Sequence, residues 1–270
     1  MLTIFTTCYP FVGERKRVQQ NAILSWTHLT PKPEIFLTAA IRDEQETVKA
    51  FAKEHNLPFI DLEYHECGLP LYNKAFLKLC NEAQNDVICI VVPDIIFLQS
   101  LMESVKILKQ LRFQSWVATG RRCNLDLNIE LDWNSPETEK MLYRLIAEKG
   151  VLESPSAGDY HVFTKNIDWS HIPPFIWGRT NTDTWINADV LERGIPLINI
   201  TDDNTIIHPM HTRNMSPEFQ KMYAEQNKIN IELAGHKSVG SDVATYYLSR
   251  GLIYPAALYL TYVSGKSHIL

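Results

Sequence analysis

The chain has 270 residues, 45% of them hydrophobic, which is enough for one large α/β domain with a sizeable buried core. Its 26 basic and 31 acidic residues give a net charge of −5, which excludes an overall basic field that would gather nucleic acid or anionic membranes nonspecifically. The five cysteines include no CxxC pair, which argues against a disulfide framework or structural zinc site, so we expect a cytoplasmic protein.

The first hundred residues alternate between short apolar runs and amphipathic segments. Apolar and β-branched runs predict strands at residues 2–8, 34–40, 58–62 and 86–92. Apolar residues at helical spacing predict helices at 15–29, 43–55 and 71–83. This order predicts a single Rossmann-related α/β domain, with a mainly parallel central sheet flanked by helices and ligands at the carboxyl ends of its strands.

The second half of the chain has a less regular pattern. Residues 115–120 predict another strand, and 135–149 predict a helix. After Gly150, proline, glycine and aromatic residues crowd positions 154–180, which we interpret as loops that frame an acceptor cleft. The weakly polar run from Leu252 to Val263 is too short to span a membrane, so we expect at most a peripheral membrane contact.

Three residues are candidate metal ligands. Asp94 directly follows the most uniformly apolar strand, where its carboxylate can bind Mg²⁺ or Mn²⁺, although aspartate is equally suited to cap a helix from Ile95. His208 and His211 flank Pro209, which argues against a helical zinc motif. This spacing favours a loop that gives one imidazole to a metal held mainly by carboxylates, and the alternative is an inert surface pair.

Two later segments carry candidate groups for catalysis and sugar binding. Asp183, between Arg179 and Trp185, is a candidate base for an acceptor hydroxyl, or alternatively the N-cap of a helix at 184–192. Gly158 and Asp159 form a turn where a backbone amide can approach a sugar or phosphate, and an ordinary hairpin turn is the alternative.

Further candidates near predicted strand ends suit a nucleotide. Asp43 can bond a base or ribose, or begin a helix, and Thr6 and Thr7 can offer hydroxyls, or satisfy the strand end. Arg15, in the cluster Arg15-Lys-Arg17, can meet a diphosphate or lie in a solvated helix start.

Other features narrow the function class. The sequence has no Walker loop, GxGxxG fingerprint, GxSxG elbow or kinase motif set, which excludes the commonest phosphate-binding and hydrolase classes. Three tryptophans, Trp169, Trp177 and Trp185, suit either stacking on an acceptor sugar or packing in the core.

Taken in order, several segments resemble GT-A-fold nucleotide-sugar glycosyltransferases, particularly a little-characterised bacterial and plant group. The early segments are Ile4-Phe-Thr-Thr, the Trp26 helix, Arg42-Asp43-Glu44 and Cys67-Gly-Leu-Pro-Leu-Tyr-Asn73. The later segments are Val92-Pro-Asp94, Gly158-Asp-Tyr, Pro173-Pro-Phe-Ile-Trp-Gly-Arg179, Asp183-Thr-Trp and Ile207-His208-Pro-Met-His211. The likeness spans most of the chain.

This resemblance implies a nucleotide-diphosphate sugar donor, most often UDP-linked, and a glycan, lipid-linked or protein acceptor. It implies a nucleotide-binding half at residues 1–115 and an acceptor-binding half with C-terminal helices at 116–270. The residues that it places near the nucleotide are Thr6, Thr7, Asp43 and Asn73. It further implies Mn²⁺ or Mg²⁺ at Asp94, a second metal contact from His208 or His211, and Asp183 as the base of an inverting displacement.

The sequence departs from this pattern at the usual Asp-x-Asp metal motif, which is reduced to Val92-Pro93-Asp94. This departure leaves metal dependence and retaining chemistry open. It also keeps a catalytically silent nucleotide-sugar binding module as an alternative function. A sugar nucleotidyltransferase is a further alternative, disfavoured because the start of the chain has no Gly-rich, basic pyrophosphate loop.

Overall fold

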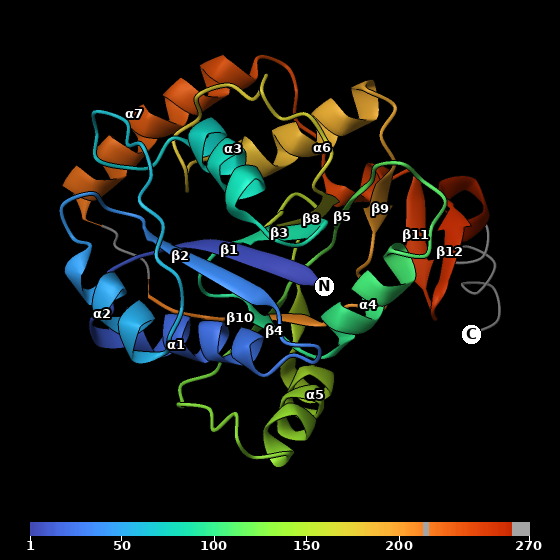
Figure 1. Cartoon of the computed structure of the whole chain (residues 1–270), viewed down its shortest axis with the longest axis horizontal. Helices are drawn as coiled ribbons and strands as arrows, with labels where there is room; N and C mark the ends of the chain where they lie inside the picture. The colour runs from blue at the N-terminus through green and yellow to red at the C-terminus, as the bar shows by residue number, and fades with distance from the viewer. Residues whose placement is uncertain (213–215, 261–270) are drawn as a thin grey trace.

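The computed structural model describes residues 1–212 and 216–260 (Figure 1). Within these residues eight strands form the central sheet, in the order β12-β11-β9-β5-β8-β3-β1-β2. They are β1 (Leu2–Cys8), β2 (Glu34–Ala39), β3 (Val87–Val91), β5 (Val117–Thr119), β8 (Tyr160–Thr164), β9 (Leu197–Asn199), β11 (Tyr246–Ser249) and β12 (Leu252–Pro255). Neighbouring strands run parallel, except where β8 meets β3 and β5 and where β12 meets β11.

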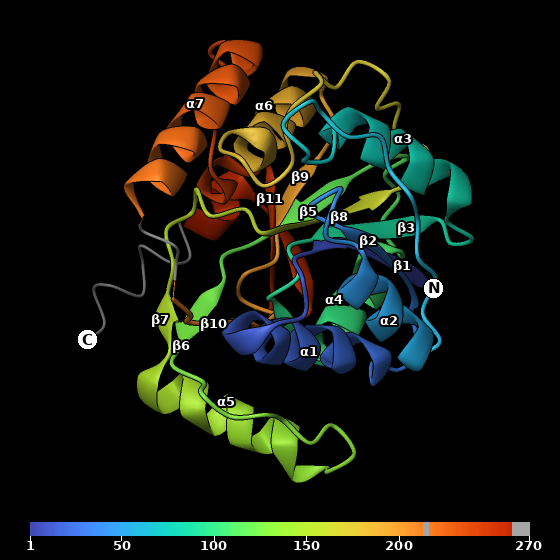
Figure 2. The same ribbon diagram turned by 90° about the vertical axis from the view of Figure 1, so that its left-hand side faces the viewer.

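Helices cover both faces of this sheet (Figures 1 and 2). One face carries α1 (Gly13–Thr27), α2 (Glu46–Glu54) and α4 (Ser100–Leu108), with α5 (Glu137–Lys149) beyond them. The other face carries α3 (Tyr72–Glu82), α6 (Thr182–Glu192) and α7 (Pro217–Ala234). A hydrophobic core lies on each face of the sheet, the first against α1, α2 and α4 and the second against α3 and α6. Ile4 of β1 packs in the first core, and its neighbour Phe5 packs in the second. Both faces of β1 are therefore buried, which explains its continuous apolar run.

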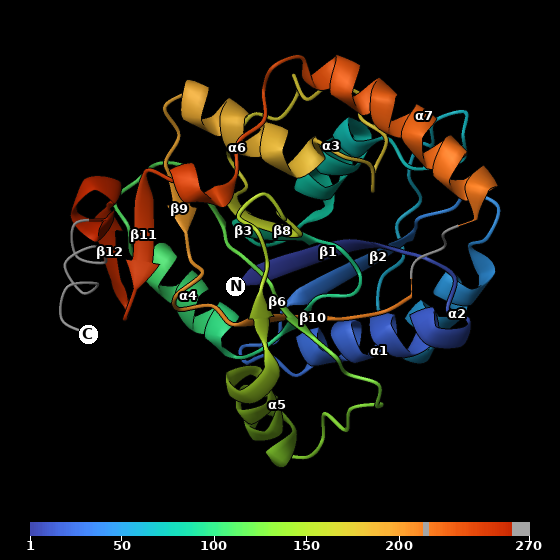
Figure 3. The same ribbon diagram turned by 180° about the vertical axis from the view of Figure 1, so that it is seen from behind.

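A second, smaller sheet joins segments that are far apart in the sequence (Figure 3). In the described residues it has the order β4-β10-β6-β7. Its strands are β4 (Ile96–Phe97), β10 (Ile206–Pro209), β6 (Cys123–Leu125) and β7 (Val151–Leu152). Because β10 pairs antiparallel with β4 and parallel with β6, residues near positions 95, 124 and 208 meet in one place.

The predicted mainly parallel sheet with flanking helices is confirmed, but two predicted elements are wrong in detail. Instead of a strand at 58–62 there is a single bridge between Leu37 and Phe59, next to Pro58, which has no N–H for a ladder. The helix predicted from Asp43 begins at Glu46.

Two further predictions, a helix cap at Asp94 and the loops after Gly150, are also corrected. Asp94 does not cap a helix at Ile95, because β4 follows it and α4 begins at Ser100. The loops expected at positions 154–180 are interrupted by β8, whose residues join the core.

The two predicted halves of the chain, residues 1–115 and 116–270, both contribute strands to one sheet. β1, β2 and β3 lie before residue 115, and β5, β8 and β9 after it. The assignment of a nucleotide-binding and an acceptor-binding half stays a prediction. The run from Leu252 to Val263 begins as β12 and ends outside the described residues. Within residues 1–212 and 216–260, no helix combines the length and apolarity needed to cross a membrane.

Candidate active site

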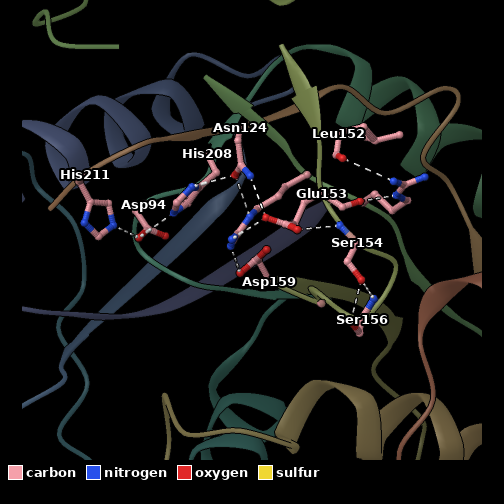
Figure 4. A network of polar contacts seen from close by, with 12 residues as sticks. Asp94, Asn124, Leu152, Glu153, Ser154, Ser156, Asp159, His208 and His211 are labelled. Atoms are coloured by element: carbon pink, nitrogen blue, oxygen red, sulfur yellow. Dashed lines mark hydrogen bonds and ion pairs between the residues drawn. The ribbon is translucent and has the colours of Figure 1, made fainter. Parts of the chain in front are cut away.

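The three predicted metal ligands lie together at the carboxyl end of β3. β4 places Ile96 opposite Ile207 of β10, and this pairing brings the preceding Asp94 beside His208. Asp94 Oδ2 is 3.5 Å from His208 Nε2 and 3.1 Å from His211 Nε2 (Figure 4). One potential ligand atom from each residue lies within 4.8 Å of the others. His208 lies in β10 rather than in the predicted loop.

Asn124 determines which nitrogen of His208 carries a proton. In the register of β6 and β10, Asn124 is paired with His208. Asn124 Oδ1 accepts a hydrogen bond from Arg122 Nε at 3.1 Å, and Asn124 Nδ2 donates to Glu153 Oε2 at 2.8 Å. Because Arg122 can only donate and the ionised Glu153 carboxylate can only accept, the amide orientation is fixed. His208 Nδ1, 3.1 Å from Asn124 Oδ1, must then donate.

This tautomer makes the cluster suited to a cation. A neutral His208 with its proton on Nδ1 turns the Nε2 lone pair toward the acceptor Oδ2 of Asp94. Asp94 Oδ1 is also buried, without a hydrogen-bond partner in the described part of the chain. Two imidazoles and one carboxylate form a mixed nitrogen and oxygen ligand set, which suits Mn²⁺ better than Mg²⁺.

The cluster also holds Asp94 in its charged form. Burial alone would raise the pKa of Asp94, but when the imidazoles of His208 and His211 are protonated, their hydrogen bonds and positive charge lower it below its ordinary value. The hydrogen bond to Asp94 in turn raises the pKa of His211, against the effect of burial. An ionised carboxylate is the form that binds a metal.

The cluster lies in the wall of a cavity of about 560 Å³, here named the donor cavity after the nucleotide-sugar donor that the family resemblance predicts. Thr7 and Arg15 reach this cavity from β1 and α1. The Arg15 guanidinium lies 4.1 Å above the ring of Tyr9, whose backbone exchanges two hydrogen bonds with the Gln19 amide, at 2.7 and 3.0 Å. Positively charged side chains beside a metal cluster can bind a diphosphate.

A second cavity of about 440 Å³ adjoins the donor cavity, and it is here named the acceptor cavity because the predicted base Asp183 lines it. Asp183 lines it from the first turn of α6, which begins at Thr182, so Asp183 is not the N-cap. Gly158 N donates to Asp183 Oδ2 at 3.0 Å. Burial raises the pKa of Asp183, although backbone N–H groups of Gly158 and Thr184 oppose that effect. Asp183 is thus held in place with a raised proton affinity, as a general base requires.

Asp159 lies in the wall shared by the two cavities. Its Oδ1 accepts a hydrogen bond from Arg122 Nη1 at 2.7 Å, whereas its Oδ2 is buried without a partner among the residues described. Burial raises the pKa of Asp159 to about 6, with a further increase from the charge of Asp94, although Arg122 opposes both. Trp177 lines both cavities as well, and it is buried in the second core together with Trp169 and Trp185.

Three predicted nucleotide-binding residues lie apart from the donor cavity. Thr6 is fully buried within the sheet, facing away from the lining residue Thr7. The Asp43 side chain is 80% exposed and lies 3.4 Å from Arg42 in the turn before α2. Asn73 lies in the first turn of α3, where its Oδ1 accepts from the backbone N–H of Lys74.

Sequence reasoning missed the residues that support the metal cluster, namely Arg122, Asn124 and Glu153. They lie on or beside strands of two and three residues, β7 and β6, which are too short to show a periodic pattern. One signal was available, because Arg121 and Arg122 follow directly after the strand predicted at 115–120. A cation at the end of a buried strand is a candidate ligand contact.

Comparison with solved structures supports the fold. The structure of residues 1–349 of S. aureus TarS in complex with UDP-GlcNAc matches with a TM-score of 0.54 and 10% sequence identity, over 89% of this chain and 69% of that chain. The fold is GT-A-like. A mannosyltransferase from Pyrobaculum calidifontis, in complex with GDP-Man and Mn²⁺, matches at a TM-score of 0.48 and 12% identity, over 85% of this chain and 62% of that chain. No model of a protein family and no curated protein matches the sequence.

The match to the TarS structure confirms the GT-A-like fold predicted from the sequence. At 10% identity this match bears on the fold alone, and the chemistry must be argued from the side chains.

Proposed function

We propose that this protein is a metal-assisted glycosyltransferase. It transfers a sugar from a nucleotide-diphosphate donor, with UDP as the nucleotide, to a hydroxyl of a glycan, lipid-linked or protein acceptor. The observation that carries this proposal is the cluster of Asp94, His208 and His211 in the donor cavity, beside an acceptor cavity lined by Asp183. UDP is the first nucleotide to test because the TarS structure holds UDP-GlcNAc.

The donor cavity offers a separate group for each part of such a donor. Arg15 is proposed to bind the diphosphate, and Thr7 the nucleoside, because both line this cavity. Asp159 is proposed to accept a hydrogen bond from a donor-sugar hydroxyl, since its Oδ2 is unpaired among described residues. Gly158 is proposed to act through Asp183, to which its N–H already donates. For Thr6, Asp43 and Asn73, the nucleotide contact rests on the family resemblance alone.

The proposed reaction is an inverting displacement. The acceptor oxygen attacks the anomeric carbon, while its proton passes to Asp183. The bond between that carbon and the diphosphate oxygen breaks, and its electron pair leaves with the diphosphate. Asp94, His208 and His211 would hold Mn²⁺ or Mg²⁺, which when bound supplies positive charge opposite the leaving group.

Release of UDP from UDP-sugars tests this function. The assay uses the full chain with Mn²⁺, a panel of UDP-sugars and mixed saccharide acceptors. Asp183→Asn should lower transfer by about 10²- to 10⁴-fold while UDP binding persists. Glu192→Gln, which changes an exposed carboxylate of the same helix, is the matched control and should keep full activity.

Each other outcome has a distinct meaning. Full transfer by Asp183→Asn would remove the base assignment but not the function. UDP-sugar binding without transfer or hydrolysis would favour the silent binding module suggested by the missing Asp-x-Asp motif. Pyrophosphate formation from a nucleoside triphosphate and a sugar phosphate would indicate a nucleotidyltransferase instead.

A further inference from the structure

The walls of the two cavities differ in charge. The donor cavity is lined by Arg15, Arg122 and the imidazoles of His208 and His211, together with the carboxylates of Asp94 and Asp159. The charged residues of the acceptor cavity are Asp159, Asp183 and Arg179. Two carboxylates and one guanidinium leave the described lining of the acceptor cavity with an excess of negative charge, which disfavours an anionic ligand.

The basic side chains of the acceptor cavity are already engaged. Arg179 is buried, where its Nε donates to Gln226 Oε1 at 2.6 Å and its Nη1 donates to the Gly178 carbonyl at 2.8 Å. Its guanidinium also lies 4.8 Å from the centre of the Tyr223 ring. An incoming phosphate or carboxylate would have to displace these contacts to pair with Arg179.

The one histidine in the described lining of this cavity carries no charge at neutral pH. His161 is buried and lies 2.9 Å from Asn187 Oδ1 through its Nε2. Burial lowers the pKa of His161 to about 4, despite this hydrogen bond. His161 thus offers an anionic acceptor no positive charge, and Arg179 can form a direct ion pair with one only if its contacts to Gln226 and Gly178 are displaced.

The remaining lining suits a saccharide. Trp177 lies at the junction of the cavities, with its ring edge-on to Phe5 at 5.6 Å and tilted against Tyr72 at 4.6 Å. Tyr223 and the hydroxyl of Ser238 complete the aromatic and polar surface. Aromatic rings that packing holds in place can receive the C–H face of a sugar, while hydroxyl and carboxylate groups bond its rim.

We propose that the acceptor cavity binds an uncharged saccharide, so that the acceptor is the neutral end of a glycan or glycoside rather than a phosphorylated or uronic-acid-bearing sugar. This inference rests on the proposed function. The hydroxyl proton of the acceptor saccharide passes to Asp183 as the acceptor oxygen forms a bond to the anomeric carbon of the donor sugar. The bond from that carbon to the diphosphate breaks, and the diphosphate leaves with the electron pair.

Matched pairs of saccharides test this inference. Methyl glucoside, galactoside, mannoside and N-acetylglucosaminide, each with its 6-phosphate or uronate counterpart, are titrated against the protein in the presence of UDP and Mn²⁺. Saturation-transfer NMR measures binding. We expect at least one neutral glycoside to bind, and its charged counterpart to bind about tenfold more weakly.

Two variants show whether the acceptor cavity causes this discrimination. Asp183→Asn removes one negative charge from the wall and should reduce the preference for the neutral member severalfold. Glu192→Gln removes an exposed charge elsewhere on α6 and should leave it unchanged. The inference is overturned if charged members bind as tightly as neutral ones, if no neutral member binds, or if Asp183→Asn leaves the preference unaltered.

The same samples separate this inference from the proposed function. Hydrolysis of UDP-sugars without acceptor reports on the donor reaction, whereas glycoside binding reports on the acceptor cavity. UDP-sugar turnover with a preference for anionic acceptors would refute the inference alone. Neutral-glycoside binding without any UDP binding or turnover would refute the transferase and leave a saccharide-binding cavity.

Discussion

Replacement of Asn124 by alanine should weaken metal binding without touching a proposed ligand. Asn124 Oδ1 holds His208 through Nδ1, and this contact turns Nε2 toward Asp94. The same amide joins Arg122 to Glu153. Asn124→Ala removes all three hydrogen bonds and leaves His208 free to rotate or to take the other tautomer.

The magnitude follows from those contacts. Loss of a hydrogen bond that orients a metal-binding histidine typically lowers metal affinity by about 10- to 100-fold. Three hydrogen bonds are lost at a partly exposed amide, two of them to the charged side chains of Arg122 and Glu153, so the loss of stability should be on the order of 3 kcal/mol. We expect Mn²⁺ affinity to decrease by about 10- to 100-fold while the protein remains folded.

Calorimetric titration with Mn²⁺ and thermal unfolding together measure both quantities. Asn128→Ala is the matched control, because Asn128 is an exposed asparagine of the same segment, bonded to Asp126 and Arg17. Wild-type Mn²⁺ affinity in Asn124→Ala would refute the argument that Asn124 orients His208. Equal weakening in Asn128→Ala would show a general effect of the segment.

Three further changes test separate parts of the account. Gly158→Ala places a Cβ 2.9 Å from Asp183 Cβ and 3.0 Å from its Oδ2. The unfolding free energy measured in urea should therefore decrease by about 1 to 3 kcal/mol and sugar transfer should be slower, whereas wild-type turnover would contradict this. Burial raises the pKa of Asp159 to about 6, above its value of about 3.9 in unfolded chains, so this group stabilises the fold at about pH 4 and that stability is lost as the pH rises through about 6. Relative to Asp159→Asn, wild-type unfolding free energy should fall by about 2 kcal/mol between these pH values, whereas a constant difference would refute the assignment. Arg15→Gln should weaken UDP binding about tenfold by calorimetry, while the exposed Lys16→Gln should not, and equal effects would remove the specific role of Arg15.

The sequence was sufficient for β1, β2, β3 and β5 of the main sheet and for the position of Asp94. β3 is apolar along its whole length because helices cover both of its faces, and such a run is visible without a structure. The residue after such a strand lies at the sheet edge where ligands bind, which identified Asp94 as a candidate. His208 and His211 were identified as candidates by residue type, but their contact with Asp94 required the structure.

The rest of the site depends on pairing between short, distant strands. β4 has two residues and β6 has three, so neither contains enough positions for a period, and their pairing with β10 follows from tertiary packing. The supporting role of Asn124 was therefore beyond sequence analysis. The predicted contacts of Asp43 and Asn73 depended on loop and helix-start conformations, which the residue types alone do not determine.

Titration of UDP with and without Mn²⁺ tests whether the cluster of Asp94, His208 and His211 binds a metal that holds a nucleotide. We expect UDP to bind the wild-type protein in the presence of Mn²⁺, and a chelator to abolish or strongly weaken this binding. Asp94→Asn should reproduce the effect of the chelator while the fold persists, because Asp94 joins both histidines. UDP binding of equal strength with chelator, or no UDP binding at all, would contradict a metal-assisted nucleotide-sugar site at this cluster.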